Sequence, residues 1–87
     1  MASRSKILER LLRGTSDADI PFASLCALLR DLGFEERIRG SHYIYTMRGI
    51  PEILNLQPKK SKAKVYQVRQ VRNLLVKYRL AGESDDE

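Results

Sequence analysis

The sequence predicts an α+β fold in which helices cover one face of a three-stranded antiparallel sheet, in the order α-α-β-β-β-α. Two changes of periodicity lead to this prediction. Apolar residues recur at helical spacing up to Gly33, alternate with polar residues from Phe34 to Gln57, and return to helical spacing from Val65 onward. The 87 residues suffice for one small hydrophobic core, so we expect one folded domain.

The first third of the chain is predicted to form two helices. Segment 3–14 has helical apolar spacing and ends at Gly14. In segment 20–33, Pro21 lies near the helix start and Gly33 follows the helix end. We expect Cys26, on the flank of this second helix, to be a core residue and not a reactive thiol. The apolar stripe of the second helix consists of Phe22, Leu25, Leu28, Leu29 and Leu32.

The middle of the chain is predicted to form the sheet. Segments 34–39, 42–47 and 52–57 alternate in polarity, and because the turns between them are short they must be antiparallel neighbours. We expect Tyr45 to be a core residue, with base stacking as the alternative. The middle strand should place Tyr43, Tyr45 and Met47 on one face, and His42, Ile44 and Thr46 on the other.

The last third is predicted to hold a basic loop and a helix. Pro58 should end the sheet, "KKSKAK" should form the loop, and the helix should span 65–80. Its apolar stripe consists of Val65, Val68, Val71, Leu74, Leu75 and Tyr78. Residues 21–80 would then be the main domain. We expect 1–20 to be a helical extension and linker, either covering apolar surface or contacting a partner, and 81–87 to be an acidic disordered tail.

Charge favours a polyanionic partner. The net charge is +5, and no acidic residue occurs between Ile53 and Gly82, where eight basic residues lie. Nucleic acid is the first candidate and a membrane surface the second, although core-facing stripes and a sheet argue against a membrane-surface peptide. A lone cysteine suits a reducing cytosol, and no apolar run reaches the length of a membrane span, so we expect a cytoplasmic protein.

Several kinds of chemistry are excluded by residue counts. One histidine and one cysteine cannot supply a zinc-type ligand set, and the sequence has neither a P-loop nor a dinucleotide fingerprint. His42 beside many cations suits RNA cleavage, in which a base takes the proton of the 2′-hydroxyl and cations stabilise the phosphorane. Imidazole, with an ordinary pKa of about 6.5, provides both proton states near neutral pH. That scheme needs no metal and no cofactor, but a lone histidine beside a turn is more often structural, so these residues alone do not favour catalysis.

The segment "LCALLRDLGFEERIRGSHYIYTM" followed by "KAKVYQVRQVRNLL" resembles the HicA toxin family of prokaryotic toxin–antitoxin modules, over about residues 22–80. Its most specific part is Leu32-Gly33-Phe34 placed six residues before Gly40-Ser41-His42. The resemblance implies a double-stranded-RNA-binding-domain-like fold, metal-independent cleavage of mRNA with His42 as catalytic residue, and a HicB-type antitoxin that covers the site. The chain departs from the family in having Tyr43 where a second histidine is common, and in its N-terminal extension.

We therefore expect an endoribonuclease toxin (an mRNA interferase) of a type II system, in which His42 is the general base or acid. The sequence does not identify the second proton-transfer group, for which Lys60, Lys62 and a tyrosine hydroxyl are candidates. The alternative is a non-catalytic RNA-binding module of the same fold, in which His42 supports the turn. The residues expected to contact RNA are Arg39, Gly40, Ser41, Lys59, Lys60, Lys62, Lys64, Arg69 and Arg72.

The reasons differ within this set. Gly40 and Ser41 should form a turn, with phosphate contact as their second role. The four lysines should open the last helix, whose first amides favour an anion. Arg69 and Arg72 share a helix face away from the apolar stripe, so they should hold either RNA or an acidic antitoxin surface.

Overall fold

The computed structural model describes residues 2–80, with side chains from Lys6 onward, and the predicted acidic tail lies outside this range. It contains the helices α1 (Ala2–Arg13), α2 (Phe22–Asp31) and α3 (Val65–Lys77), with a 3-10 turn η1 (Asp17–Asp19) between the first two. The strands β1 (Glu35–Arg39), β2 (His42–Met47) and β3 (Ile50–Leu56) form an antiparallel sheet in the order β1-β2-β3. The predicted α+β fold and the order α-α-β-β-β-α are confirmed.

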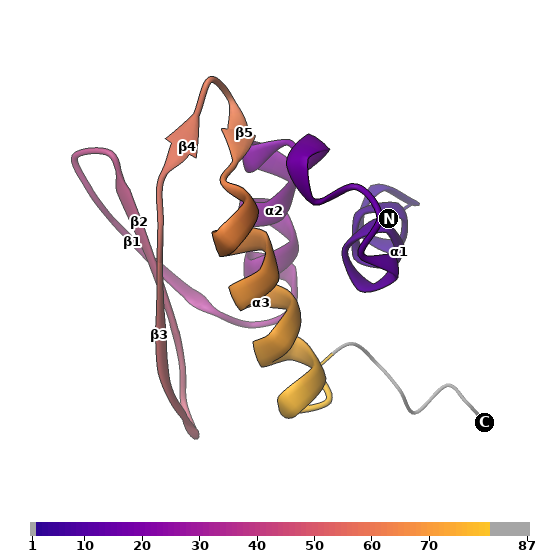
Figure 1. Ribbon diagram of the computed structural model, residues 1–87. Helices are drawn as coiled ribbons and strands as arrows, with labels where there is room; N and C mark the ends of the chain where they lie inside the picture. The colour runs from indigo at the N-terminus through magenta and orange to yellow at the C-terminus, as the bar shows by residue number, and fades with distance from the viewer. Residues whose placement is uncertain (1, 81–87) are drawn as a thin grey trace.

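The elements form layers. Helices α2 and α3 lie on one face of the sheet, as predicted, and α1 packs on the far side of these two helices (Figure 1). Ile7 and Leu11 of α1 are buried in the shared core, so the N-terminal helix covers apolar surface. Within residues 2–80, no helix combines the length and apolar character needed to span a bilayer.

The sheet shows the predicted alternation. Tyr45 is fully buried, and Tyr43 and Met47 pack against the core on the same face, whereas His42 on the opposite face is exposed. Tyr43 meets Phe22 of α2 edge-to-face, with ring centroids 4.9 Å apart. The inner face of the sheet therefore packs against the helices, and the outer face, which carries His42, is directed toward solvent.

Hydrogen bonds hold the buried side chain of Tyr45 in place. The hydroxyl of Tyr45 donates to the Glu36 carboxylate of β1 at 2.6 Å, and Arg30 of α2 donates to the same oxygen at 2.7 Å. These bonds lower the pKa of Glu36, the Tyr45 hydroxyl contributing most. Cys26 is buried nearby, and burial raises the pKa of its thiol. The core assignments of Tyr45 and Cys26 are thus confirmed.

The predicted basic loop is wrong, because the segment forms a second hairpin. Strands β4 (Pro58–Lys59) and β5 (Lys62–Ala63) pair antiparallel around a two-residue turn. Main-chain bonds to the α2 region hold the hairpin: Ala63 N–H donates to the Ile20 carbonyl at 2.9 Å, and Phe22 N–H donates to the Ser61 carbonyl at 3.0 Å. The lysines therefore precede α3 instead of forming its first turn, and only Lys64 lies at its N-cap.

Candidate functional site

The β1–β2 turn presents the Gly-Ser-His motif at one end of the sheet. Arg39 and His42 are paired across the hairpin, so Gly40 and Ser41 are its two turn residues. Gly40 has φ +60°, and Ser41 is not among the described residues with positive φ, which is the pattern of a type II′ turn. A Cβ atom at Gly40 would meet nothing within 4 Å. The predicted turn role of Gly40 is confirmed, and the turn is open to a ligand.

His42 is held by a side chain from the neighbouring strand. Its Nδ1 lies 3.0 Å from Oδ1 of Asn55 on β3, and both residues are exposed on the outer face of the sheet. When the Asn55 oxygen accepts, Nδ1 carries the hydrogen, and Nε2 keeps a lone pair that faces away from the asparagine. In this tautomer, Nε2 is the nitrogen that can accept a proton. The register also places Arg39 directly across from His42, which brings a cation beside the imidazole.

Asn55 was missed by the sequence analysis. The available signal was its polarity between Leu54 and Leu56, which are both buried. That alternation shows that Asn55 faces solvent, but it does not show which residue of the middle strand it reaches.

Two glutamines connect the turn to the start of α3, and we call Gln57 and Gln67 the glutamine bridge. Gln57 Nε2 donates to Ser41 Oγ at 3.1 Å, and the Gln57 backbone N–H donates to Gln67 Oε1 at 3.3 Å. Gln67 is buried and its Nε2 donates to the Tyr66 hydroxyl at 3.4 Å. Ser41, the residue before His42, is therefore connected through the two glutamines to Tyr66 at the start of α3. Neither glutamine was predicted to belong to the site.

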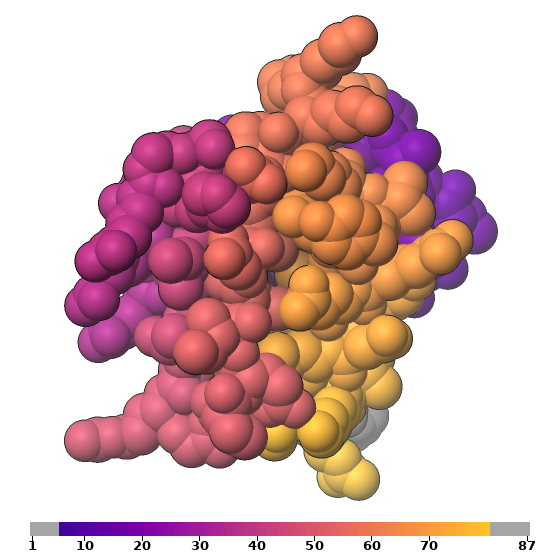
Figure 2. All heavy atoms as spheres, turned by 60° about the vertical axis from the view of Figure 1, so that its left-hand side comes forward, coloured from indigo at the N-terminus to yellow at the C-terminus, as the bar shows by residue number. Residues whose placement is uncertain are grey.

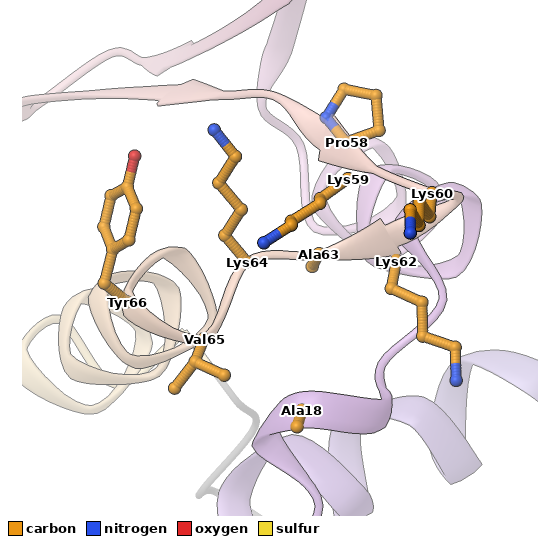
Figure 3. Close-up of a pocket in the computed structure, with 9 residues that line it drawn as sticks. All are labelled: Ala18, Pro58, Lys59, Lys60, Lys62, Ala63, Lys64, Val65 and Tyr66. Atoms are coloured by element: carbon orange, nitrogen blue, oxygen red, sulfur yellow. The ribbon is translucent and has the colours of Figure 1, made fainter.

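An open groove lies between the β4–β5 hairpin and the start of α3, and we call it the lysine groove. Nine residues line it, among them Lys59, Lys60, Lys62, Lys64 and Tyr66 (Figure 3). The hairpin and the β1–β2 turn lie at the same end of the molecule (Figures 1 and 2). The structure thus brings the predicted lysines to the end of the sheet that carries His42.

The four lysines are not equivalent. Lys62 turns away from the others and pairs with the Asp19 carboxylate of η1 (Figure 3). Lys59 and Lys64 extend into the space in front of Tyr66. Among the ion pairs of residues 6–80, none involves Lys59, Lys60 or Lys64. Three ammonium groups therefore face the groove without a carboxylate from the described chain.

Arg72 does not lie on an open binding face, contrary to the prediction. Its guanidinium donates to both oxygens of Asp17 at 2.8 and 3.1 Å and to the Leu11 carbonyl at 3.2 Å. Arg72 thus attaches the N-terminal segment to α3. Arg69 lies 3.6 Å from the same carboxylate but its side chain is 64% exposed, so it remains accessible. The hydrogen bond from Arg72 is the main cause that lowers the pKa of Asp17.

Within residues 2–80, no three His, Cys, Asp or Glu side chains converge in a way that could hold a metal ion. Comparison with protein-family models, with curated proteins and with solved structures gives no match for this chain. The resemblance to HicA toxins therefore depends on the sequence segments quoted above. Chemically, the arrangement offers an oriented imidazole, an adjacent arginine and a groove lined with cations.

Proposed function

We propose that this protein is an endoribonuclease that cleaves single-stranded mRNA without a metal, with His42 as its proton-transfer residue. The observation that carries the proposal is the bond between His42 Nδ1 and Asn55 Oδ1, which leaves Nε2 free on an exposed surface. A positioned base of this kind is what attack by a 2′-hydroxyl requires. The lysine groove and Arg39 supply the positive charge that an RNA backbone needs.

The chemistry follows from these groups. His42 Nε2 takes the proton of the 2′-hydroxyl, the oxygen bonds to the adjacent phosphorus, and the bond from phosphorus to the 5′-oxygen breaks. The products are a 2′,3′-cyclic phosphate and a 5′-hydroxyl, whose proton comes from solvent water, and His42 then returns its own proton to solvent. Arg39, opposite His42 in the hairpin, is placed to stabilise the additional negative charge of the phosphorane.

The biological role we propose is that of a toxin whose cleavage of mRNA arrests translation and growth, restrained by a HicB-type antitoxin in the cytoplasm. Its support is the family resemblance over about residues 22–80 together with the exposed Gly40-Ser41-His42 turn. Expression of the wild-type chain should arrest growth, and His42→Ala should not. A chain that arrests growth equally with either residue would contradict this role.

The decisive experiment measures cleavage of a single-stranded RNA by purified His42→Ala. We expect a rate lower by about 10²–10⁴-fold with nearly unchanged RNA affinity, because a proton-transfer group is lost and a binding surface is not. Thr46→Ala, on the same strand and face, is the matched control and should cleave normally. Cleavage should persist in excess chelator. If His42→Ala cleaves at the wild-type rate, His42 is not the proton-transfer residue. If neither protein cleaves RNA, a non-catalytic RNA-binding module is the remaining function.

A further inference from the structure

Tyr66 is an exposed aromatic residue that the fold does not use for packing. Among the four tyrosines, all within the described chain, Tyr45 is buried and Tyr43 and Tyr78 pack against the core. Tyr66 is 62% exposed, and its hydroxyl accepts a hydrogen bond from Gln67 Nε2 at 3.4 Å. A large ring held at its hydroxyl with its face in water is a surface for a flat ligand.

The residues beside the Tyr66 ring are positively charged, which favours a negatively charged ligand. Lys64 extends beside the Tyr66 ring, and Lys59 reaches from the hairpin into the same space (Figure 3). The groove lining also includes the apolar residues Pro58, Ala63 and Val65. An exposed aromatic ring with two ammonium groups on one side of it fits a molecule that carries a flat aromatic base and a phosphate.

We infer that the lysine groove binds one nucleotide of single-stranded RNA, with its base stacked on Tyr66 and its phosphate held by Lys59 and Lys64. That the ligand is RNA rests on the proposed function; the stacking and the charge rest on the groove. A duplex does not fit, because its paired bases keep their faces inside the stack. The groove therefore selects for unpaired RNA independently of the catalytic step.

The glutamine bridge relates this nucleotide to the site of cleavage. Gln67 contacts Tyr66, and Gln57 contacts Ser41, the neighbour of His42. The nucleotide on Tyr66 and the phosphate at His42 then belong to one RNA strand that crosses the end of β3. The groove then holds the strand in register with the imidazole.

A tryptophan at position 66 tests the stacking directly, because the chain contains no tryptophan. Tyr66→Trp is placed in a His42→Ala background so that RNA survives the titration. Val76→Trp in the same background is the matched control, since Val76 lies on the same helix and is 61% exposed against 62% for Tyr66. The probes are a single-stranded RNA oligonucleotide, the corresponding RNA duplex, and inorganic polyphosphate.

Single-stranded RNA should strongly quench the tryptophan fluorescence of Tyr66→Trp, and duplex RNA and polyphosphate should leave it nearly unchanged. The fluorescence of Val76→Trp should not respond to any probe. In parallel, Tyr66→Leu should bind single-stranded RNA about 10-fold more weakly and polyphosphate equally well, whereas Tyr66→Phe should bind both as the wild type does. Quenching of Tyr66→Trp by polyphosphate, or unchanged RNA affinity of Tyr66→Leu, would overturn the inference.

These binding readouts do not depend on cleavage. Stacking on position 66 together with wild-type cleavage by His42→Ala would retain the groove and reject the proposed catalysis. Loss of cleavage in His42→Ala together with no effect at Tyr66 would do the reverse.

Discussion

Asp17 and Arg72 lie 55 positions apart in the chain and form a two-pronged ion pair with distances of 2.8 and 3.1 Å. Their side chains are 13% and 20% exposed, so both charges are largely withdrawn from water. Arg72 also donates to the last turn of α1 through the Leu11 carbonyl. Arg72, which local sequence patterning assigned to an external ligand, therefore makes the main polar contact between the N-terminal segment and α3.

Asp17→Asn should lower the free energy of unfolding by about 1–3 kcal/mol, because it leaves the Arg72 charge without its partner in a partly buried place. Urea denaturation followed by circular dichroism measures this. Arg69→Gln is the control: its side chain is exposed and 3.6 Å from Asp17, so we expect a loss below about 0.5 kcal/mol. Equal losses in the two variants would show that the pair does not hold the segment.

The same pair gives a pH dependence. The Arg72 hydrogen bond lowers the pKa of Asp17 from its usual 3.8, so the folded carboxylate binds a proton less readily than the unfolded one. Its contribution to stability is then complete above pH 3.8 and is lost as the pH falls through the lower folded pKa. Below about pH 4, the wild type should lose stability more steeply than Asp17→Asn. Parallel curves for the two proteins would contradict this.

Asn55 should affect turnover by orienting His42. Asn55→Ala removes the acceptor of His42 Nδ1, and we expect kcat to fall about 10-fold with KM nearly unchanged, since the asparagine positions the base and does not bind RNA. Asn55→Asp places a carboxylate beside the ring and favours imidazolium, so the acid limb of the pH–rate profile should move to higher pH. Ile53→Thr, on the same strand and face, should change neither quantity.

Periodicity predicted what depends on local alternation. Successive side chains of a strand point to opposite faces, so Tyr43, Tyr45 and Met47 were placed correctly on the core side of β2. The Gly40-Ser41 pair marked a turn because a type II′ turn requires positive φ at its first position. Which β3 residue reaches His42 depends instead on strand register. The pairing of β2 with β3 shifts between Tyr45 and Met47, and no local pattern reports such a shift.

The β4–β5 hairpin was missed for two physical reasons. Its turn residues, Lys60 and Ser61, have φ of 51° and 64° and are not the Asn-Gly pair that usually marks such a turn. Its main-chain partners, Ile20 and Phe22, lie about forty residues earlier in the chain. The ion pair of Lys62 with Asp19 could not be predicted for the same reason, because the two residues are similarly far apart in the sequence.

Substitutions in the turn of the β4–β5 hairpin should raise the stability of the protein. Left-handed backbone at a residue other than glycine or asparagine costs about 1 kcal/mol, so Lys60→Asn with Ser61→Gly should raise the free energy of unfolding by about 1–2 kcal/mol. Ser61→Gly alone keeps every lysine and should leave RNA affinity nearly unchanged. Lys59→Asn, at a position without positive φ, is the control for the substitution itself and should not stabilise. A double variant less stable than the wild type would contradict the turn geometry.

Salt dependence should separate the lysines that face the groove from the one that does not. Lys59, Lys60 and Lys64 have no carboxylate partner in the described chain, so each one that contacts a phosphate should contribute about 0.7 to the slope of log affinity against log salt for single-stranded RNA. Replacing all three with Gln should flatten the slope by up to about 2. Lys62→Gln should leave the slope nearly unchanged, because Asp19 already neutralises Lys62.

Removing Asp19, the partner of Lys62, tests whether this ion pair keeps Lys62 from contacting RNA. Asp19→Asn deletes a negative charge at the rim of the groove and releases Lys62, so RNA should bind more tightly and the slope should steepen. The double variant Asp19→Asn with Lys62→Gln should return the slope to the wild-type value, since the released cation is then absent. If Lys62→Gln alone flattens the slope as much as any other lysine variant, RNA displaces Asp19 from Lys62 on binding. Lys62 would then contact the phosphate backbone in the complex.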